Sequence, residues 1–264
     1  MEGLGEGLLA WKGVAVGAWL TLLLAAERLF PAVPFPATTA WSRPARNLAF
    51  LAISALVSLA VVVPVSTLAV GLALGLRPSW ATGGLGLALD LLLLDFLIYW
   101  WHRANHRVPF LWRFHEVHHL DRFLDVTTAV RFHFGEVILS ALARACVIAL
   151  FTIPLSSVLA FETLVLAGAA FHHSNLKLPP AFERALSWIV VTPAIHWVHH
   201  HRVRRDTDSN YATVLSLWDR IFGSRSPTHR TPEMEIGVEG REEQRLTGLL
   251  LRPFRVQESA ARSA

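Results

Sequence analysis

The sequence predicts an all-α fold: a multi-pass membrane helical bundle of about four spans or hairpins, with a cytoplasmic helical cap that carries histidines. Three observations predict it. Of the 264 residues, 53% are hydrophobic and only 17% are charged, and the mean hydropathy is +0.42, which is too apolar for an ordinary soluble domain. Long apolar runs fill roughly the first hundred residues, whereas the C-terminal third is much more polar. Twelve of the thirteen histidines lie between residues 102 and 201.

The first two expected spans precede the histidines. Residues 8–30 are long enough to cross a hydrocarbon core of about 30 Å at about 1.5 Å per residue, and three prolines follow directly. Residues 47–76 are too long for one upright span and carry Pro64 in the middle. They predict either a tilted, kinked helix or a pair of helices that dip into the bilayer. The loop between these two segments is expected to carry Arg43 and Arg46.

A third span, residues 84–101, runs directly into the first histidines and contains Asp90 and Asp95. Carboxylates inside a membrane are costly, so they are usually paired or functional. The spacing of four, three and four places Asp95 on one helix face with Tyr99, His102 and His106. We therefore expect Asp95 either to accept a hydrogen bond from a metal-binding imidazole or to pair with an arginine elsewhere.

Residues 137–171 predict a helical hairpin, turned at Pro154, Ser156 and Ser157. Each arm is short for a span, so the hairpin either re-enters the bilayer or leans against the other helices. Arginines concentrate in residues 31–46 and 102–135, and the positive-inside rule then places the N-terminus outside and every histidine set on the cytoplasmic side. The expected location is the bacterial inner membrane.

The chain after the hairpin is expected to form a polar cap. Residues 178–192 predict an amphipathic helix that either lies in the membrane interface or packs on the cap's own core. In the first case Phe182, Leu186 and Ile189 face lipid. Residues 249–254 are a second candidate for membrane contact, and residues 257–264 are expected to be disordered.

The charge balance excludes several classes of function. The formal net charge is +4 and the isoelectric point about 10.0, which we attribute to cytoplasmic-loop arginines and a preference for the membrane surface. No nucleic-acid partner is expected, because no basic run alternates with aromatic residues. Cys146 is the only cysteine, so there is no intramolecular disulfide and no thiolate zinc site. The acidic N-terminus predicts that the first apolar run stays as an anchor.

Three sets of histidines have the spacing of metal ligands on helices. His102 and His106 are four residues apart, and two later sets repeat the spacing i, i+3, i+4. Side chains so spaced lie on one helix face, and neutral imidazole is a common ligand of transition metals. Eight such histidines exceed the needs of one tetrahedral ion, which favours two metals. The two later sets are His115, His118 and His119, and His196, His199 and His200.

Other residues are weaker candidates. FHHSN (171–175) adds His172 and His173, of which we expect His173 to complete the site. RFHFGE (131–136) offers either further ligands or a structural salt-bridge cluster through Arg131, His133 and Glu136. A carboxylate di-iron bundle needs two Glu-x-x-His motifs, and the sequence has only the one from Glu116 to His119, which excludes that class. The two remaining histidines, expected not to be ligands, are His201 and His229.

HRANH, HEVHH, FHHSN and HWVHHH, in this order around these spans, resemble the fatty acid hydroxylase superfamily, also called the sterol desaturase family, over roughly residues 85–225. DFLIYWWHRANH is similar to the family's Asp-x-x-x-Tyr-x-x-His-Arg-x-x-His stretch, and residues 207–224 to its segment after the last histidine box. RFHFGE departs from the pattern, because many members have proline at the position of Phe134.

The resemblance implies a membrane oxygenase with two iron ions that uses O2 to hydroxylate or desaturate a C–H bond of a lipid. A sterol, a fatty acyl chain, an alkylglycerol ether and a carotenoid all remain open as substrates. Electrons are expected from an external carrier, cytochrome b5-like or a ferredoxin with its reductase, because the chain has no dinucleotide, haem or iron–sulfur motif. The implied catalytic residues are Asp95, Tyr99 and Asn175, and the implied iron ligands are His102, His106, His115, His118, His119, His173, His196, His199 and His200.

The expected domains are an N-terminal transmembrane region (1–84), a catalytic domain (85–225) and a C-terminal polar tail (226–264). Two alternatives remain open. A metal transporter or sensor would place its ligands near the bilayer midplane, whereas these histidines lie at helix ends. A protein that only scaffolds other membrane proteins would not need intact histidine sets.

Overall fold

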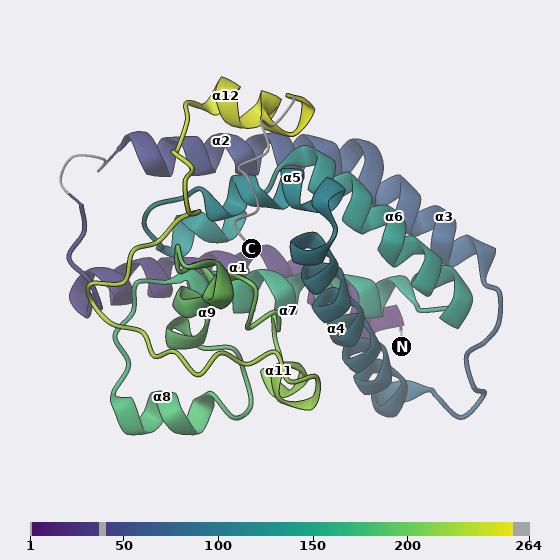
Figure 1. Cartoon of the computed structure of the whole chain (residues 1–264). Helices are drawn as coiled ribbons and strands as arrows, with labels where there is room; N and C mark the ends of the chain where they lie inside the picture. The colour runs from purple at the N-terminus through teal and green to yellow at the C-terminus, as the bar shows by residue number, and fades with distance from the viewer. Residues whose placement is uncertain (1, 37–40, 256–264) are drawn as a thin grey trace.

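The computed structural model describes residues 2–36 and 41–255, with only the backbone described for residues 2–12. The described chain contains no strand and only three isolated β-bridges, which confirms the all-α prediction (Figure 1). The helices of the bundle are α1 (Glu2–Leu29), α2 (Ser42–Val57), η2 (Ser58–Val62), α3 (Val63–Leu72), α4 (Gly83–Arg107), α6 (Phe134–Phe151) and α7 (Leu155–His173). Those around them are α5 (Pro109–His119), η3 (Val126–Val130), α8 (Pro180–Leu186), α9 (Pro193–His199), α10 (Arg204–Thr207), α11 (Leu217–Ile221), α12 (Leu246–Leu251) and η4 (Arg252–Phe254).

Four helices of the described chain are long and apolar enough to cross a membrane: Ser42–Leu72, α4, α6 and α7. The first is continuous, because α2, η2 and α3 follow one another without a break, so one long helix is present and not a pair of helices. The π-helical turn η2 lies just before Pro64, which cannot donate a backbone hydrogen bond and so favours a wider turn there. This helix begins at Ser42. Arg43 and Arg46 therefore lie in its first turns, and the prediction of a loop was wrong for them.

The predicted hairpin is confirmed as α6 and α7, with a shifted turn. Thr152 adopts a left-handed conformation (φ 51°) and ends α6, and Pro154 precedes α7. Ser156 and Ser157 already belong to the first turn of α7, because the left-handed residue and the proline suffice to reverse the chain. The arms pack on different neighbours: α6 lies along α3, whereas α7 lies along α1 and α4. A cavity described below lies between the two arms.

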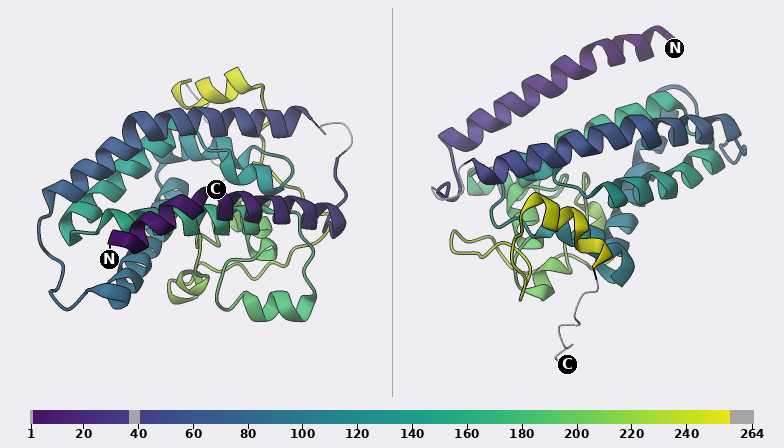
Figure 2. Two further views of the ribbon diagram at one scale, coloured as in Figure 1. Left: turned by 180° about the vertical axis from the view of Figure 1, so that it is seen from behind. Right: turned by 90° about the horizontal axis from the view of Figure 1, so that it is seen from above.

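The N-terminal helix α1 agrees with the predicted helix over residues 8–30, although it is not one of the four candidate spans among the described residues. It lies across one side of the molecule along α7 (Figure 2). Trp19 Nε1 donates to the carbonyl oxygen of Ala167 at 3.0 Å. At its end, the Glu27 carboxylate accepts the backbone N–H groups of Val126 and Asn175. These bonds tie α1 to the segments that carry the histidines.

The cap is less helical than the sequence predicts. The expected helix at 178–192 is only the seven-residue α8, because Pro179 and Pro180 delay its start and the chain turns at Ser187. Phe182 and Ile189 are 55% and 63% exposed, as expected for side chains that face lipid, and Leu186 is half-buried. Near the C-terminus Leu251 and Phe254 are also exposed. The tail at 257–264 lies outside the described residues.

Candidate metal centre

A tight corner between α4 and α5 brings the first two histidine sets together. Helix α4 continues beyond its apolar part to Arg107, so His102 and His106 lie one turn apart on its buried face. Val108 is extended (φ −96°, ψ 114°), and Pro109 starts α5 directly afterwards, because the residue before a proline avoids the helical region and proline suits the first helical position. Helix α5 then turns its three histidines inward.

The other ligand candidates come from α9 and from the end of α7. Thr192 is extended and Pro193 starts α9, which is only seven residues long but carries His196 and His199, with His200 at its C-cap. His173 is the last residue of α7. The nine candidates are almost completely buried, with exposed fractions of 0 to 9%. Four separate helices thus deliver imidazoles to one buried place.

The nine predicted ligands lie in two clusters. Within each, one ligand atom per residue lies within 4.8 Å of all the others. The closest pairs of Nε2 atoms are 2.9 to 3.2 Å apart. The five-histidine cluster contains His102, His106, His115, His119 and His199, and the four-histidine cluster contains His118, His173, His196 and His200.

Backbone carbonyl oxygens fix the tautomers of four histidines so that Nε2 is free to bind a metal ion. The Nδ1 atoms of His102 and His199 lie 2.8 and 2.6 Å from the carbonyl oxygens of Tyr211 and Ser209. Those of His118 and His173 lie 3.2 and 2.8 Å from the carbonyl oxygens of Arg131 and Ala169. A carbonyl oxygen only accepts, so Nδ1 carries the proton and Nε2 keeps its lone pair. The Nε2 lone pairs of His118 and His173 then face each other at 3.0 Å.

A shared cation is the natural partner for such facing lone pairs. Nitrogen ligands bind transition ions at about 2.0–2.1 Å, which leaves neighbouring ligand atoms about 3 Å apart. That is the separation found between the closest pairs here. Outside the spans, burial first and the neighbouring histidines second lower the pKa of His118, His119, His196 and His200. These imidazoles therefore stay neutral, which is the form that binds metal.

A carboxylate contact to a ligand imidazole exists, but Asp95 does not make it. Glu136 Oε1 accepts from His115 Nδ1 at 2.8 Å and from Asn105 Nδ2 at 3.1 Å. Asp95 Oδ2 accepts instead from the Leu215 N–H and from Trp218 Nε1, at 3.2 and 2.8 Å. Neither partner is an imidazole or an arginine, so both interpretations of Asp95 were wrong. Its carboxylate ties α4 to the segment whose Tyr211 carbonyl orients His102.

The other two residues predicted to be catalytic also make structural contacts. The Tyr99 hydroxyl lies 2.8 Å from Ser224 Oγ and accepts from Arg103 at 3.1 Å, so it holds the same segment as Asp95. The side chain of Asn175 both donates to and accepts from the backbone of Val33. Its hydrogen bonds fix the connection after α1, and none of them reaches a histidine cluster.

The remaining histidines lie outside both clusters. His133 accepts from the Gly135 N–H at the start of α6 and contacts the Leu250 carbonyl oxygen at 3.0 Å. The ring of His172 lies against that of His196, with centroids 4.0 Å apart and the planes tilted by 43°, but only its neighbour His173 belongs to a cluster. His201 pairs with Asp206 at 2.8 Å, and His229 is exposed. The four-histidine cluster thus contains His173, whereas His172, His201 and His229 belong to neither cluster.

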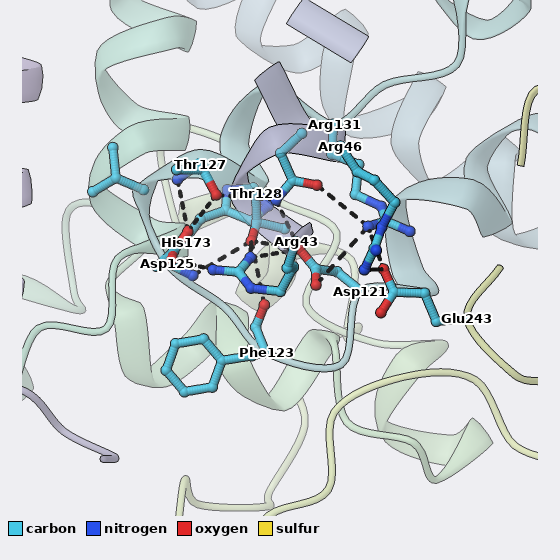
Figure 3. A network of polar contacts seen from close by, with 12 residues as sticks. Arg43, Arg46, Asp121, Phe123, Asp125, Thr127, Thr128, Arg131, His173 and Glu243 are labelled. Carbon is cyan, nitrogen blue, oxygen red and sulfur yellow. Dashed lines mark hydrogen bonds and ion pairs between the residues drawn. The ribbon is translucent and has the colours of Figure 1, made fainter. Parts of the chain in front are cut away.

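A buried ion-pair network supports the segment that follows α5 (Figure 3). Arg43 of α2 donates to Asp121 at 2.9 Å and also pairs with Asp125. Arg131 Nε donates to the Val117 carbonyl oxygen at 2.9 Å, and its Nη1 to Glu243 at 2.9 Å. Since the backbone oxygen of Arg131 orients His118, this network positions part of the four-histidine cluster. Sequence reasoning missed the partners, because backbone carbonyls and distant ion pairs leave no local pattern.

An apolar cavity of about 470 Å³ opens between the arms of the hairpin and reaches both clusters. At one end it is lined by His102 and His115 of the five-histidine cluster, and by His118, His173 and His196 of the other. The walls continue along Ile98, Val137 and Val165 into the spans. An alkyl chain in this cavity would reach the clusters without crossing water.

These features define a class: a helical membrane protein with two buried, all-histidine clusters, each able to hold a metal ion, beside an apolar cavity. Residues 87–224 match the model of a family described as fatty acid hydroxylase, and the chain belongs to this family.

Curated relatives are similar over part of their length. The chain is 36% identical over 141 residues to an alkylglycerol monooxygenase of Xenopus tropicalis, which covers 53% of this chain and 30% of that protein. It is 28% identical over 166 residues to the ornithine lipid hydroxylase OlsE of Rhizobium tropici, covering 63% and 49%. It is 29% identical over 171 residues to a very-long-chain aldehyde decarbonylase of Oryza sativa, covering 58% and 26%. The chain thus spans less than half of each relative, and no solved structure matches it.

Proposed function

We propose that the protein is a membrane di-iron oxygenase that hydroxylates or desaturates a C–H bond of a lipid, with O2 as co-substrate. The observation that carries the proposal is the common wall between the histidine clusters and the apolar cavity. The names of the reported relatives support lipid oxidation. Hydroxylation balances as one C–H bond, O2, two electrons and two protons giving one alcohol and one water. Desaturation breaks two C–H bonds on neighbouring carbons with the same O2, electrons and protons, and gives one alkene and two waters.

The chain's own residues bind, orient and exclude water. The nine clustered histidines would hold the two ions, which supply O2 activation when bound. Glu136 orients His115, and the carbonyl oxygens of Tyr211 and Arg131 fix the rings of His102 and His118. The apolar cavity walls hold the lipid chain and keep water away. We propose Asp95, Tyr99 and Asn175 as positioning residues, because their hydrogen bonds hold the segments around the clusters.

The proposed catalytic unit, residues 85–225, does not form the cavity alone. Leu51, Ser54 and Ser66 of the N-terminal region (1–84) also line it. From the C-terminal segment (226–264), Arg252 forms a two-bond ion pair with Glu116 of α5, at 2.7 and 2.9 Å. We therefore propose that both flanking regions are needed for a formed site.

Electrons would enter beside Trp112. Its ring lies 5.0 Å from that of His106 and 5.4 Å from that of His119, and the Arg204 guanidinium lies 4.9 Å from its centre. Arg107, Arg113 and Arg205 are exposed on the same segments. We propose this surface as the docking site of an acidic carrier, cytochrome b5-like or a ferredoxin, whose association would weaken with rising salt concentration.

The proposed location is a bacterial inner membrane, with the clusters on the cytoplasmic side. The supporting observations are the arginines of residues 102–135 and the similarity to a Rhizobium protein. Attachment of a membrane-impermeant reagent to a single cysteine placed at Arg205 would test the orientation, with labelling in inverted vesicles and protection in intact spheroplasts as the expected result. A cysteine-free background (Cys146→Ser) keeps the label specific.

The decisive experiment for the proposed function uses oxygen isotopes. Cells that express the protein, or the His118→Ala variant, are supplied with labelled O2, and their lipids are compared by mass spectrometry. A lipid alcohol that carries the label only with the wild type supports hydroxylation, and a new alkene supports desaturation. The purified wild type is expected to bind about two iron ions, although zinc can compete for imidazole sites on overexpression. Unchanged lipids together with metal uptake into proteoliposomes would instead favour a transporter.

A further inference from the structure

A charged pair crosses the cavity far from the clusters. Arg144 lies in the middle of α6 and Glu162 in the middle of α7, and Arg144 Nη2 donates to Glu162 Oε1 at 3.2 Å. Both side chains line the cavity, with exposed fractions of 17% and 32%. Ionisable residues inside a membrane are costly, so they are rarely retained without a role. The proposed metal chemistry does not use this pair.

A third polar group lies at the same level. Helices α3 and α6 run side by side in the same direction, as shown by the bond from Ser54 Oγ to the Phe132 carbonyl oxygen and by that from the Leu74 N–H to the Ala149 carbonyl oxygen. Interpolation between these two bonds places Ser66 within about one helical turn of Arg144. Ser66 also lines the cavity. Polar side chains from α3, α6 and α7 therefore gather at one depth.

Two hydrogen-bond donors at this level are unused among the described residues. Arg144 Nε and Ser66 Oγ are buried and have no hydrogen-bond partner. The neighbouring cavity walls, Val62, Val158 and Val165, are apolar. A buried polar group without a partner costs free energy, so a purely structural ion pair does not explain why these donors are kept. A ligand with an oxygen acceptor would satisfy them.

The distance to the metal clusters fits one alkyl chain. From Glu136, which contacts His115, to Arg144 is about 12 Å along α6, and from His173 to Glu162 is about 16 Å along α7, at about 1.5 Å per residue. Residues from both ends line the same cavity. A lipid chain could thus hold one end at the pair while a carbon further along it lies beside the histidines.

We propose that Arg144, Glu162 and Ser66 form a binding site for an uncharged oxygen acceptor, such as an ester or keto carbonyl, carried by the lipid substrate. The acceptor is uncharged because Glu162 already balances the charge of Arg144, so a carboxylate would be buried without a counter-ion in a medium of low dielectric constant. This site fixes which carbon of the chain reaches the clusters. The inference rests on the proposed function, since it describes that substrate.

Binding without turnover tests the site. The full-length, iron-loaded protein in lipid nanodiscs is kept anaerobic, and dodecane, methyl dodecanoate and dodecanoate compete with a fluorescent alkyl probe. The wild type is expected to bind the ester about tenfold more tightly than dodecane, as for one charge-assisted hydrogen bond, and dodecanoate no better than the ester. Arg144→Met should abolish this preference, and Ser66→Ala should reduce it several-fold.

Thr67→Val is the matched control. Thr67 lines the same cavity, but its hydroxyl already donates to the Val63 carbonyl oxygen at 2.9 Å, so the ester preference should persist. If both Arg144→Met and Ser66→Ala keep the wild-type preference, the site is refuted, and if Arg144→Met does not fold, Ser66→Ala decides alone. If dodecanoate binds more tightly than methyl dodecanoate, the site prefers a charged acceptor and the proposed uncharged ligand is wrong. A wild type that binds iron but oxidises no lipid refutes the proposed function without touching this binding result.

Discussion

The two histidine clusters differ in what supports their ligands. The five-histidine cluster has an anionic neighbour, because Glu136 accepts from His115 at 2.8 Å. Within the described chain, the Nδ1 bonds of the four-histidine cluster go only to carbonyl oxygens, from His118 and His173. The other two members have no Nδ1 partner, which is also true of two members of the five-histidine cluster. A carboxylate raises the basicity of the imidazole that it orients. The two candidate metal sites are therefore unequal, and we expect the four-histidine cluster to hold an ion less tightly.

The clusters also differ in how they are assembled. The five-histidine cluster takes four of its members from the continuous stretch 102–119, and only His199 comes from elsewhere. The four-histidine cluster draws on α5, α7 and α9 and therefore depends on distant helices being held in place. The four-histidine cluster has no carboxylate contact to its imidazoles, and its members come from three separate helices. We therefore predict that a destabilised fold disturbs this cluster before the other.

The largest expected effect follows from removing a ligand of the weaker cluster. His118→Ala should lose the ion of the four-histidine cluster and nearly all product. The loss of activity should exceed the about 10–100-fold that follows when a residue that only orients a ligand is changed. Metal analysis of the purified protein and lipid mass spectrometry measure the two losses. His229→Ala, which changes an exposed histidine outside both clusters, is the control. Wild-type product from His118→Ala would remove the four-histidine cluster from the proposed chemistry.

The next effect concerns the network beside His118 and His119. Arg43→Met leaves Asp121 and Asp125 buried without their main cation, which costs about 3–5 kcal/mol for a buried pair. Thermal unfolding of the detergent-solubilised protein should show the loss. Arg202→Met breaks a largely exposed pair with Glu235 and should cost about 0–1 kcal/mol. Equal melting temperatures for the two variants would show that the ion pairs of Arg43 do not stabilise the fold around the four-histidine cluster.

The sequence predicts the histidine ligands better than it predicts the residues that orient them. The spacing of His102, His106 and the α5 histidines follows from one periodic rule, so the sequence predicts that they converge. The choice between His172 and His173 depends on where α7 ends, which no local pattern determines. Glu136 was noted, but its role depends on a contact between α5 and α6. Asp95 shared a face with His102 as predicted, yet its partner Trp218 comes from a segment more than a hundred residues later.

A carboxylate variant tests the inequality directly. Glu136→Gln keeps an oxygen acceptor but removes the negative charge beside His115, so the metal affinity of the five-histidine cluster should fall by about 10–100-fold. Titration with a chelator measures this. The wild type should release its metal in two phases, at two chelator concentrations. In the variant these two concentrations should lie closer together, because the tighter site has become weaker. Glu235→Gln, on the exposed pair with Arg202, should behave as wild type. Single-phase release from the wild type would contradict unequal sites.

The smallest effect is expected at the outer edge of the five-histidine cluster. Asp208 Oδ1 lies 3.5 Å from His106 Nδ1, which is too long for a strong hydrogen bond. Its other oxygen accepts from Arg204 Nε at 2.7 Å, and the side chain is 21% exposed. Asp208→Asn should therefore lower the metal affinity at most about threefold, as for a solvent-screened pair. The same chelator titration detects this. A tenfold loss would mean that His106, like His115, depends on a carboxylate, and would widen the difference between the clusters.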